Sequence, residues 1–97
     1  MTGPAEMFLK HAATIIAERR IAYGDPARSM AAIAARWSVT LGRPITSAQV
    51  ALCLIDVKLT RLAHDPAHTD SITDIAGYAA VLHAVATSRR RDRRCPS

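Results

Sequence analysis

The stretch ITSAQVALCLIDVKLTRLAH, residues 45–64, is the clearest guide to the fold, because it predicts a helix with a marked start and a marked end. Thr46 is followed three residues later by Gln49, which is the spacing of a capping box. At the other end, Pro66 disfavours helical backbone in the residue before it. The sequence therefore predicts a helix over residues 46–64.

The faces of this helix differ along its length. Its first half, through Ile55, is apolar on every side, which predicts the central and most buried element of the protein. Cys53 lies inside that run and is expected to be a small buried hydrophobe. Asp56 follows the run directly, so we expect it to face a groove or a partner chain. Lys58 and Arg61 are three residues apart and share one face of the helix.

The other helices are predicted from the residues that separate them. Gly24 ends one helix, and Asp25-Pro26 is a typical cap and first residue for the next. Gly42 and Pro44 end that second helix. The links are short, which favours antiparallel neighbours. The prediction is an all-α fold, a compact antiparallel bundle of four helices over residues 5–23, 26–41, 46–64 and 70–88.

The composition fits one small domain. The chain has 97 residues, of which 49% are apolar and 4% aromatic, and alanine-rich, aromatic-poor composition suits packed helices. A chain this short buries only a modest core, so an oligomer is expected to cover the remaining apolar surface. We assign residues 1–88 to a single helical domain and residues 89–97 to an arginine-rich tail.

The positive charge is concentrated in that tail. Residues 89–94 contain five arginines and one aspartate, which supply four of the five net positive charges of the chain. The tail could contact nucleic-acid phosphates weakly, touch an acidic partner, or serve as a solvated terminus. No aromatic residue is interleaved with the arginines, so base stacking by the tail is not expected.

The two cysteines and the hydropathy pattern indicate the cellular compartment of the protein. Cys53 lies in an apolar run and Cys95 in the basic tail, so they do not form a disulfide framework, and a reducing cytoplasm is expected. No apolar run reaches the 18 or so residues that span a membrane. The N-terminus lacks the basic-then-apolar pattern of a secretory signal.

Polar side chains concentrate where the helix 46–64 would meet the helix 70–88. Asp70, Asp74 and Tyr78 are spaced by four residues and share one face. An antiparallel hairpin brings them close to Lys58 and Arg61. Cations of this kind hold phosphate oxygens, and carboxylates hold Mg²⁺ that in turn bridges phosphates.

The candidate site therefore has three groups of residues. Lys58 and Arg61 are the predicted phosphate ligands. Asp56, Asp70 and Asp74 are predicted to hold a ligand or metal, with Mg²⁺ possible at Asp70 and Asp74. The supporting residues are His68, Ser71 and Tyr78.

Structural interpretations of the same residues stay open. Asp70 could be an ordinary N-cap, and Ser71-x-x-Asp74 matches a capping box. Lys58 and Arg61 could simply pair with these acids as a structural network. Gly77, inside the last helix, indicates close packing of a neighbouring helix or the approach of a ligand to the backbone.

An ordered series of motifs resembles a family of small phage and prophage proteins of unknown function. The resemblance covers roughly residues 12–82. The motifs are Tyr23-Gly24-Asp25-Pro26, Ile33-Ala34-x-x-Trp37-Ser38-x-x-Leu41-Gly42, Ile45-Thr46-x-x-Gln49-Val50-Ala51, Lys58-x-x-Arg61-Leu62 and His68-x-Asp70-Ser71-x-x-Asp74-Ile75-Ala76-Gly77-Tyr78-Ala79-Ala80. This resemblance implies action in the cytoplasm of a bacterial host cell.

More distantly, the series resembles the MazG-like all-α nucleoside triphosphate pyrophosphohydrolases. Those enzymes are helical oligomers that hold Mg²⁺ with Glu-Glu-x-x-Glu on one helix and Glu-x-x-Asp on the next, and they cleave between the α- and β-phosphates. This chain has no Glu-Glu-x-x-Glu, and Asp56 is the one acid in the matching stretch. Asp70 and Asp74 stand nearest to the second motif, at a spacing of four.

Three functions follow as hypotheses. The first is a MazG-like helical domain that binds a nucleotide or similar phosphorylated small molecule, with or without Mg²⁺, and either hydrolyses or sequesters it. The second is a non-enzymatic oligomer that docks on a host or phage protein. The third is weak nucleic-acid binding through the arginine tail. Whether the chain is an enzyme is left open, and no membrane partner is expected.

Overall fold

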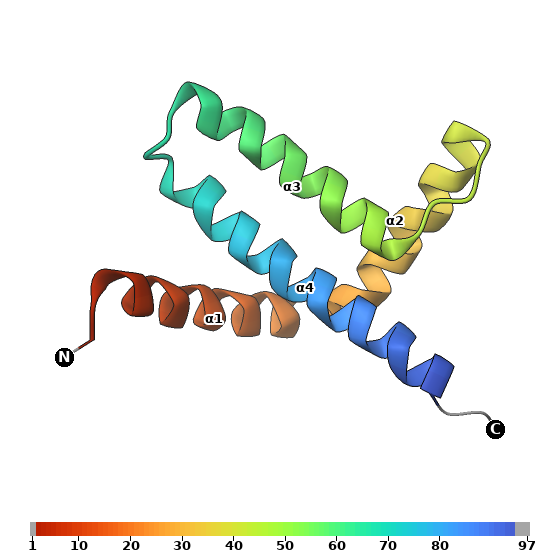
Figure 1. Ribbon diagram of the computed structural model, residues 1–97, viewed down its shortest axis with the longest axis horizontal. Helices are drawn as coiled ribbons and strands as arrows, with labels where there is room; N and C mark the ends of the chain where they lie inside the picture. The colour runs from red at the N-terminus through yellow and green to blue at the C-terminus, as the bar shows by residue number, and fades with distance from the viewer. Residues whose placement is uncertain (1, 95–97) are drawn as a thin grey trace.

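The computed structural model describes residues 2–94, with side chains for residues 2–87, and this part of the chain is all-α (Figure 1). The four helices are α1 Pro4–Tyr23, α2 Pro26–Leu41, α3 Ser47–His64 and α4 Thr69–Arg94. Each bound lies within one residue of the sequence prediction except the end of α4, which continues to Arg94 instead of ending at 88. The predictions about the tail concern side chains outside the described range.

The caps of α2 and α3 form as predicted. Asp25 Oδ1 accepts a hydrogen bond of 3.1 Å from the Ala27 N–H. In the capping box of α3, Thr46 Oγ1 accepts from the Gln49 N–H at 3.1 Å, and Gln49 Oε1 accepts from the Thr46 N–H at 2.9 Å. These bonds satisfy N–H groups that a helix leaves without partners in its first turn, so they fix where each helix begins.

The start of α4 differs from the sequence interpretation. His68 is the cap: its carbonyl accepts from the Ile72 N–H at 3.2 Å, and its Nδ1 accepts from the Ser71 N–H, also at 3.2 Å. Asp70 lies in the first turn and is not the N-cap. The side chain of Asp74 pairs with cations from other helices, so it closes no capping box with Ser71.

The helix α4 lies at the centre of the fold. The helix α4 runs antiparallel beside α3, and α1 packs against α4 on the other side (Figure 1). The helix α2 contacts both α3 and α4, near the start of α3. This corrects the prediction that the helix 46–64 is central. An apolar composition shows that α3 can pack on several sides, but it does not show on which sides a neighbour is present.

The buried core is small and lies where α2, α3 and α4 meet. Four buried residues form it, namely Met30, Ala34, Val50 and Ala51, with partly buried apolar side chains around them. The radius of gyration is 15.2 Å, whereas a compact domain of this length has about 12.5 Å. The arrangement is therefore more open than the compact bundle that the sequence predicts.

Cys53 marks the same openness on α3. It was expected to be buried, but it is an exposed free thiol. Its neighbour in sequence, Leu52, is also exposed, whereas Val50 and Ala51 are fully buried. One side of α3 packs inward, and the other carries apolar side chains that are about half exposed among the described residues. Among the described residues, every helix is too short or too polar to span a membrane.

Candidate functional site

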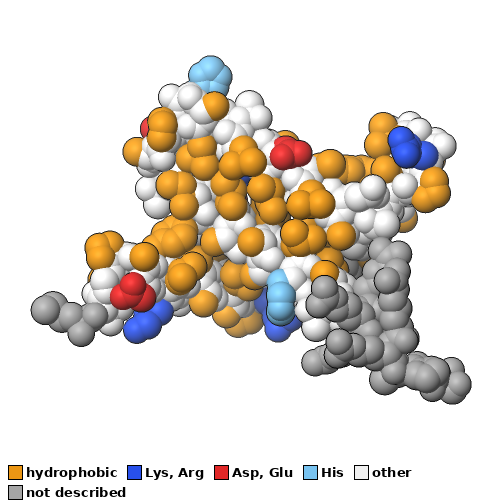
Figure 2. Space-filling view, in the orientation of Figure 1, with side chains coloured by type: hydrophobic (Ala, Val, Ile, Leu, Met, Phe, Trp, Pro, Cys, Tyr) orange, Lys and Arg blue, Asp and Glu red, His pale blue; other side chains and the backbone are white. Residues whose placement is uncertain are grey.

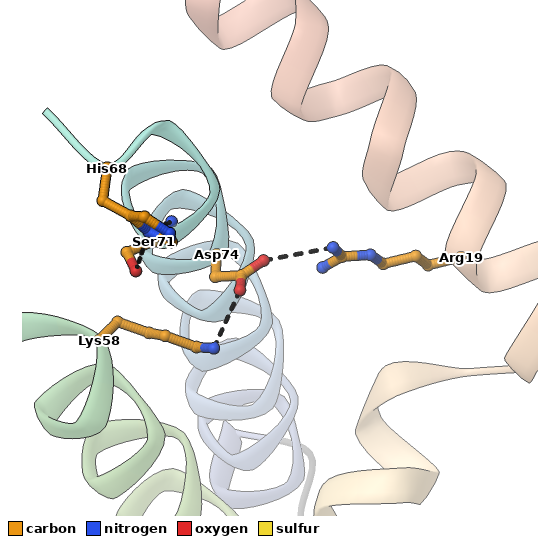
Figure 3. Close-up of polar contacts among 5 residues, drawn as sticks. All are labelled: Arg19, Lys58, His68, Ser71 and Asp74. Atoms are coloured by element: carbon orange, nitrogen blue, oxygen red, sulfur yellow. Dashed lines mark hydrogen bonds and ion pairs between the residues drawn. The ribbon is translucent and has the colours of Figure 1, made fainter. Parts of the chain in front are cut away.

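Three helices meet at one carboxylate, that of Asp74 on α4 (Figure 3). Asp74 Oδ1 lies 3.2 Å from Arg19 Nη2 on α1, and Asp74 Oδ2 lies 3.1 Å from Lys58 Nζ on α3. The side chains of Lys58 and Asp74 are 14% and 18% exposed, whereas that of Arg19 is 55% exposed. The cluster therefore has a half-buried inner pair and an outer guanidinium that water reaches.

The sequence positions these three side chains through helical spacing. Lys58 is four residues from both Leu54 and Leu62, which are half-buried, so it shares the inner face of α3. Arg19 falls in register with the inward Ala12 and Ile15 of α1. The long aliphatic stems of both cations can follow apolar surface while the charged ends reach the carboxylate.

His68 and Ser71 form a second polar unit one turn before Asp74 (Figure 3). His68 Nδ1 lies 2.7 Å from Ser71 Oγ and 3.2 Å from the Ser71 backbone nitrogen. A backbone N–H can only donate, so Nδ1 is the acceptor and the neutral imidazole carries its proton on Nε2. Ser71 is fully buried and holds the ring. The outward nitrogen of His68 is thereby a hydrogen-bond donor.

A polar cleft of about 540 Å³ opens between α1, the end of α3 and the start of α4. Its wall carries two arginines, two histidines, two threonines and two aspartates. The lining residues are His11, Ile15, Arg19, Arg61, His68, Thr69, Asp70, Thr73 and Asp74. Asp74 is already paired with Lys58 as well as Arg19, so cationic and N–H donor groups outweigh carboxylates on this wall. Such a wall favours an anion.

A second, mostly apolar recess of about 160 Å³ lies beyond the Arg19–Asp74 pair. Both residues of the pair line the recess as well as the cleft, so the two hollows share a border. The other lining residues are Ile16, Tyr23, Gly24, Pro26, Ser29, Met30, Gly77, Tyr78 and Val81. The combination places donors for an anion next to an apolar space with two tyrosines.

The predicted site residues lie in four places: on the cleft, behind the cleft wall, on the apolar recess and on the exposed side of α3. Arg61, His68, Asp70 and Asp74 line the cleft, as the hairpin argument predicts. Lys58 is held against Asp74, and Ser71 lies buried beneath His68. Tyr78 lines the apolar recess. Asp56 is exposed and, two residues before the inward Lys58, lies about 200° around α3 from it, so the structure does not bring it to the cleft.

Two ionisable residues of the cleft were missed by sequence reasoning. Arg19 comes from α1, 55 positions before Asp74 in the chain, and its signal was a cation falling on an otherwise apolar stripe. His11, which is exposed, lines the cleft from the same helix. Spacing along one helix pair could not reveal a third helix that completes the wall.

Tight helix packing does not explain the glycine at position 77. A Cβ atom added there would lie 3.9 Å from Ile16 Cγ1, which is ordinary van der Waals contact. The close-packing interpretation is therefore not supported, and the approach of a ligand stays a prediction for this glycine, which lines the recess.

The carboxylates do not assemble a metal cage. Within the described residues, no three His, Cys, Asp or Glu side chains are grouped so that they could hold a metal ion. Both oxygens of Asp74 are engaged by cations. Asp70, which makes no ion pair with the other described side chains, is the carboxylate in the cleft that could meet a cation brought in with a ligand.

Fold and site together define a small all-α protein with a polar cleft built by three helices. The chain belongs to a family described as a domain of unknown function (DUF6378), which matches residues 7–86. It is 34% identical over 82 residues to the Gene 55 protein of Mycobacterium phage D29, and 38% identical over 61 residues to the Gene 55 protein of Mycobacterium phage L5.

The matches cover 84% and 62% of this chain. They cover 54% and 39% of the two phage proteins, so the chain spans about half or less of their lengths. These findings confirm the predicted resemblance to small phage proteins of unknown function. No solved structure matches the chain significantly.

Proposed function

We propose that this protein binds a nucleotide or a similar phosphorylated small molecule across the polar cleft and the adjoining apolar recess. The observation that supports the proposal most is the convergence of Arg19, Arg61 and His68 on one wall of the cleft. The cleft volume of about 540 Å³ lies within the 300–1,000 Å³ of ordinary small-molecule sites.

The phosphates would be held by groups that the structure leaves able to donate. Arg61 is exposed on the cleft wall and can offer paired N–H donors to phosphate oxygens. Arg19 uses one Nη atom on Asp74, so its other N–H groups stay available. His68 offers Nε2–H because Ser71 fixes its Nδ1 as an acceptor. In this proposal Asp74 is a positioning residue, because it aims Arg19.

The recess would take the base of the nucleotide. Its volume of about 160 Å³ is close to the roughly 150 Å³ of an apolar cavity that binds a benzene ring. Tyr23 and Tyr78 line it, and aromatic side chains stabilise a stacked base by about 1–3 kcal/mol. Because the cleft and the recess share Arg19 and Asp74, one ligand could occupy both.

Mg²⁺ fits this site only as a companion of the phosphates. The ion is commonly bound by one or two carboxylates together with substrate phosphates, and Asp70 supplies one such carboxylate. When bound, the ion would neutralise phosphate charge. Asp70 lies in the first turn of α4, beside the same wall as His68.

A protein that binds a nucleotide in this way either hydrolyses the nucleotide or sequesters it. A MazG-like pyrophosphohydrolase would release pyrophosphate from a nucleoside triphosphate, whereas a binding protein would withhold the nucleotide from the infected bacterial cell. The two phage relatives support action in a bacterial host cytoplasm. A product assay with each bound triphosphate separates the two possibilities.

The first experiment is a calorimetric titration with nucleoside mono- and triphosphates, deoxynucleotides and cyclic dinucleotides, each with and without Mg²⁺. Arg61→Gln removes a charge-assisted hydrogen bond of about 1.5–3 kcal/mol, so the Kd should rise by about 10- to 100-fold. Arg36→Gln is the matched control, because Arg36 is exposed on α2 and lines neither hollow. Equal loss in both variants would contradict a specific phosphate contact.

Gly77→Ala tests the recess separately from the cleft. The new methyl group enters the recess without a clash, since its nearest contact is at 3.9 Å. We expect weaker binding of nucleotides but unchanged binding of inorganic pyrophosphate, which has no base. An unchanged nucleotide affinity would show that the base does not bind in the recess.

The second candidate function is that of a non-enzymatic interaction protein. Large apolar side chains stay exposed on α1, α2 and α3, including Ile21, Val39 and Leu52. Monomeric proteins rarely leave wide apolar patches uncovered. Absence of binding across the whole nucleotide panel would favour this function over the first.

A further inference from the structure

The protein exposes more surface than a monomer of its size. Its accessible surface is 7426 Å², whereas a folded monomer of 10.5 kDa exposes about 5,400 Å². The difference is about 2,000 Å². Among residues 2–87, five buried hydrophobic residues, Ala12 and the four of the core cluster, make a small interior. The chain thus leaves uncovered a large part of what a stable domain buries.

A continuous part of that surface lies along the outer face of α3. Leu52, Val57 and Leu59 are each about half exposed, and Cys53 and Thr60 lie between them. These positions recur at helical spacing on the side opposite to the buried Ala51 and the inward Lys58. Figure 2 shows hydrophobic side chains gathered along this helix. We call these five residues with Asp56 the outer α3 face.

Charge is sparse on this face. Among these six residues Asp56 is the one ionisable side chain besides the thiol of Cys53. His64 follows Thr60 one turn later on the same side, whereas Lys58 lies on the inner face and Arg61 on the cleft. Depletion of charge at the centre is a mark of protein interfaces. An acidic group without a cation beside it does not suit an anionic lipid surface.

We propose that the outer α3 face is the interface of a homodimer. A standard interface takes about 800 Å² from each partner, and obligate dimers take about 1,000–2,500 Å². The excess of about 2,000 Å² is that of the whole chain, and the outer α3 face supplies one part of it.

A second copy suits this face better than an occasional partner. The core of the single chain is small, so the outer α3 face has to be covered whenever the chain is folded. Only a partner made at the same time and in the same amount meets that condition in every cell. A twofold axis would bring the two α3 helices together, because such an interface uses the same patch twice.

The test is the mass of the whole chain in solution, measured by light scattering after size exclusion. A homodimer has twice the 10.5 kDa of the chain. Leu52→Lys and Leu59→Lys should each reduce the mass to that of one chain. Ile21→Lys is the matched control: it also places a lysine on an exposed apolar position, but on α1, and should leave the dimer intact.

Cross-linking covers the case in which a lysine variant fails to fold. In the Cys95→Ser chain, Cys53 on the outer α3 face is the one remaining thiol. A short bis-maleimide should join two copies through Cys53 at protein concentrations where an added monomeric thiol protein is not joined. A monomeric mass for the unaltered chain, absence of the cross-link, or a dimer that survives both lysine variants would overturn the proposal.

Discussion

The inner ion pair of the cluster predicts an energetic coupling between Lys58 and Asp74. We consider Lys58→Met, Asp74→Asn and the double variant. Asp74→Asn leaves a lysine that is 14% exposed without its negative partner. Lys58→Met keeps an unbranched side chain of similar length, and Asp74 retains Arg19. The double variant removes both charges at once.

The magnitude follows from burial. Exposed pairs contribute about 0–1 kcal/mol, and removing one partner of a fully buried pair costs about 3–5 kcal/mol. With 14% and 18% exposure this pair lies between the limits, so Asp74→Asn should cost about 2 kcal/mol and Lys58→Met about 1 kcal/mol. The double variant should cost about 1.5 kcal/mol, because the one charge left without a partner is that of Arg19, which is 55% exposed.

Urea denaturation followed by circular dichroism, at one fixed protein concentration, measures these free energies of unfolding. In thermal unfolding, a loss of 2 kcal/mol corresponds to roughly 8–16 °C in Tm for a domain of this size. Arg19→Gln is the control, because the guanidinium is 55% exposed and should contribute less than about 1 kcal/mol. A double variant that costs the sum of the two single variants would refute the coupling.

Three further predictions follow from individual residues. His68→Ala should destabilise the protein by about 1 kcal/mol through loss of the α4 cap, while His68→Asn, which restores a cap, should stay near the unaltered chain; equal stability of both variants would exclude the cap. Gly77→Ala should raise the free energy of unfolding by about 0.5–1 kcal/mol, since the added methyl group meets no clash, and a loss would show that the site is tighter than described. Deleting residues 89–97 should abolish any salt-sensitive binding to duplex DNA, measured by fluorescence anisotropy; binding that survives would exclude the tail.

The helix ends could be predicted because they depend on neighbouring residues. The cap bonds of Asp25 and Thr46 lie within three residues of the caps themselves. The start of α4 was placed one residue late because a histidine caps it, and histidine is not among the usual capping residues. A helix end can therefore be predicted from the neighbouring residues when one of the usual capping residues is present.

Burial and the full site could not be predicted in the same way. Cys53 lies in an apolar run, yet the neighbouring helices cover only the opposite side of α3. The hairpin argument brought Arg61, Asp70 and Asp74 together, but Arg19 and His11 reach the cleft from α1, whose packing on α4 no short motif specifies. Asp56 was assigned to the site by proximity in sequence, although it lies on the other side of its helix from Lys58.

Titration of the unaltered chain and of its Arg61→Gln variant with the nucleotide panel decides whether the cleft binds a nucleotide. We expect saturable binding of at least one nucleotide at one site per chain, weakened about 10- to 100-fold in the variant. Binding of no nucleotide, or binding that Arg61→Gln leaves unchanged, would contradict the assignment of the cleft.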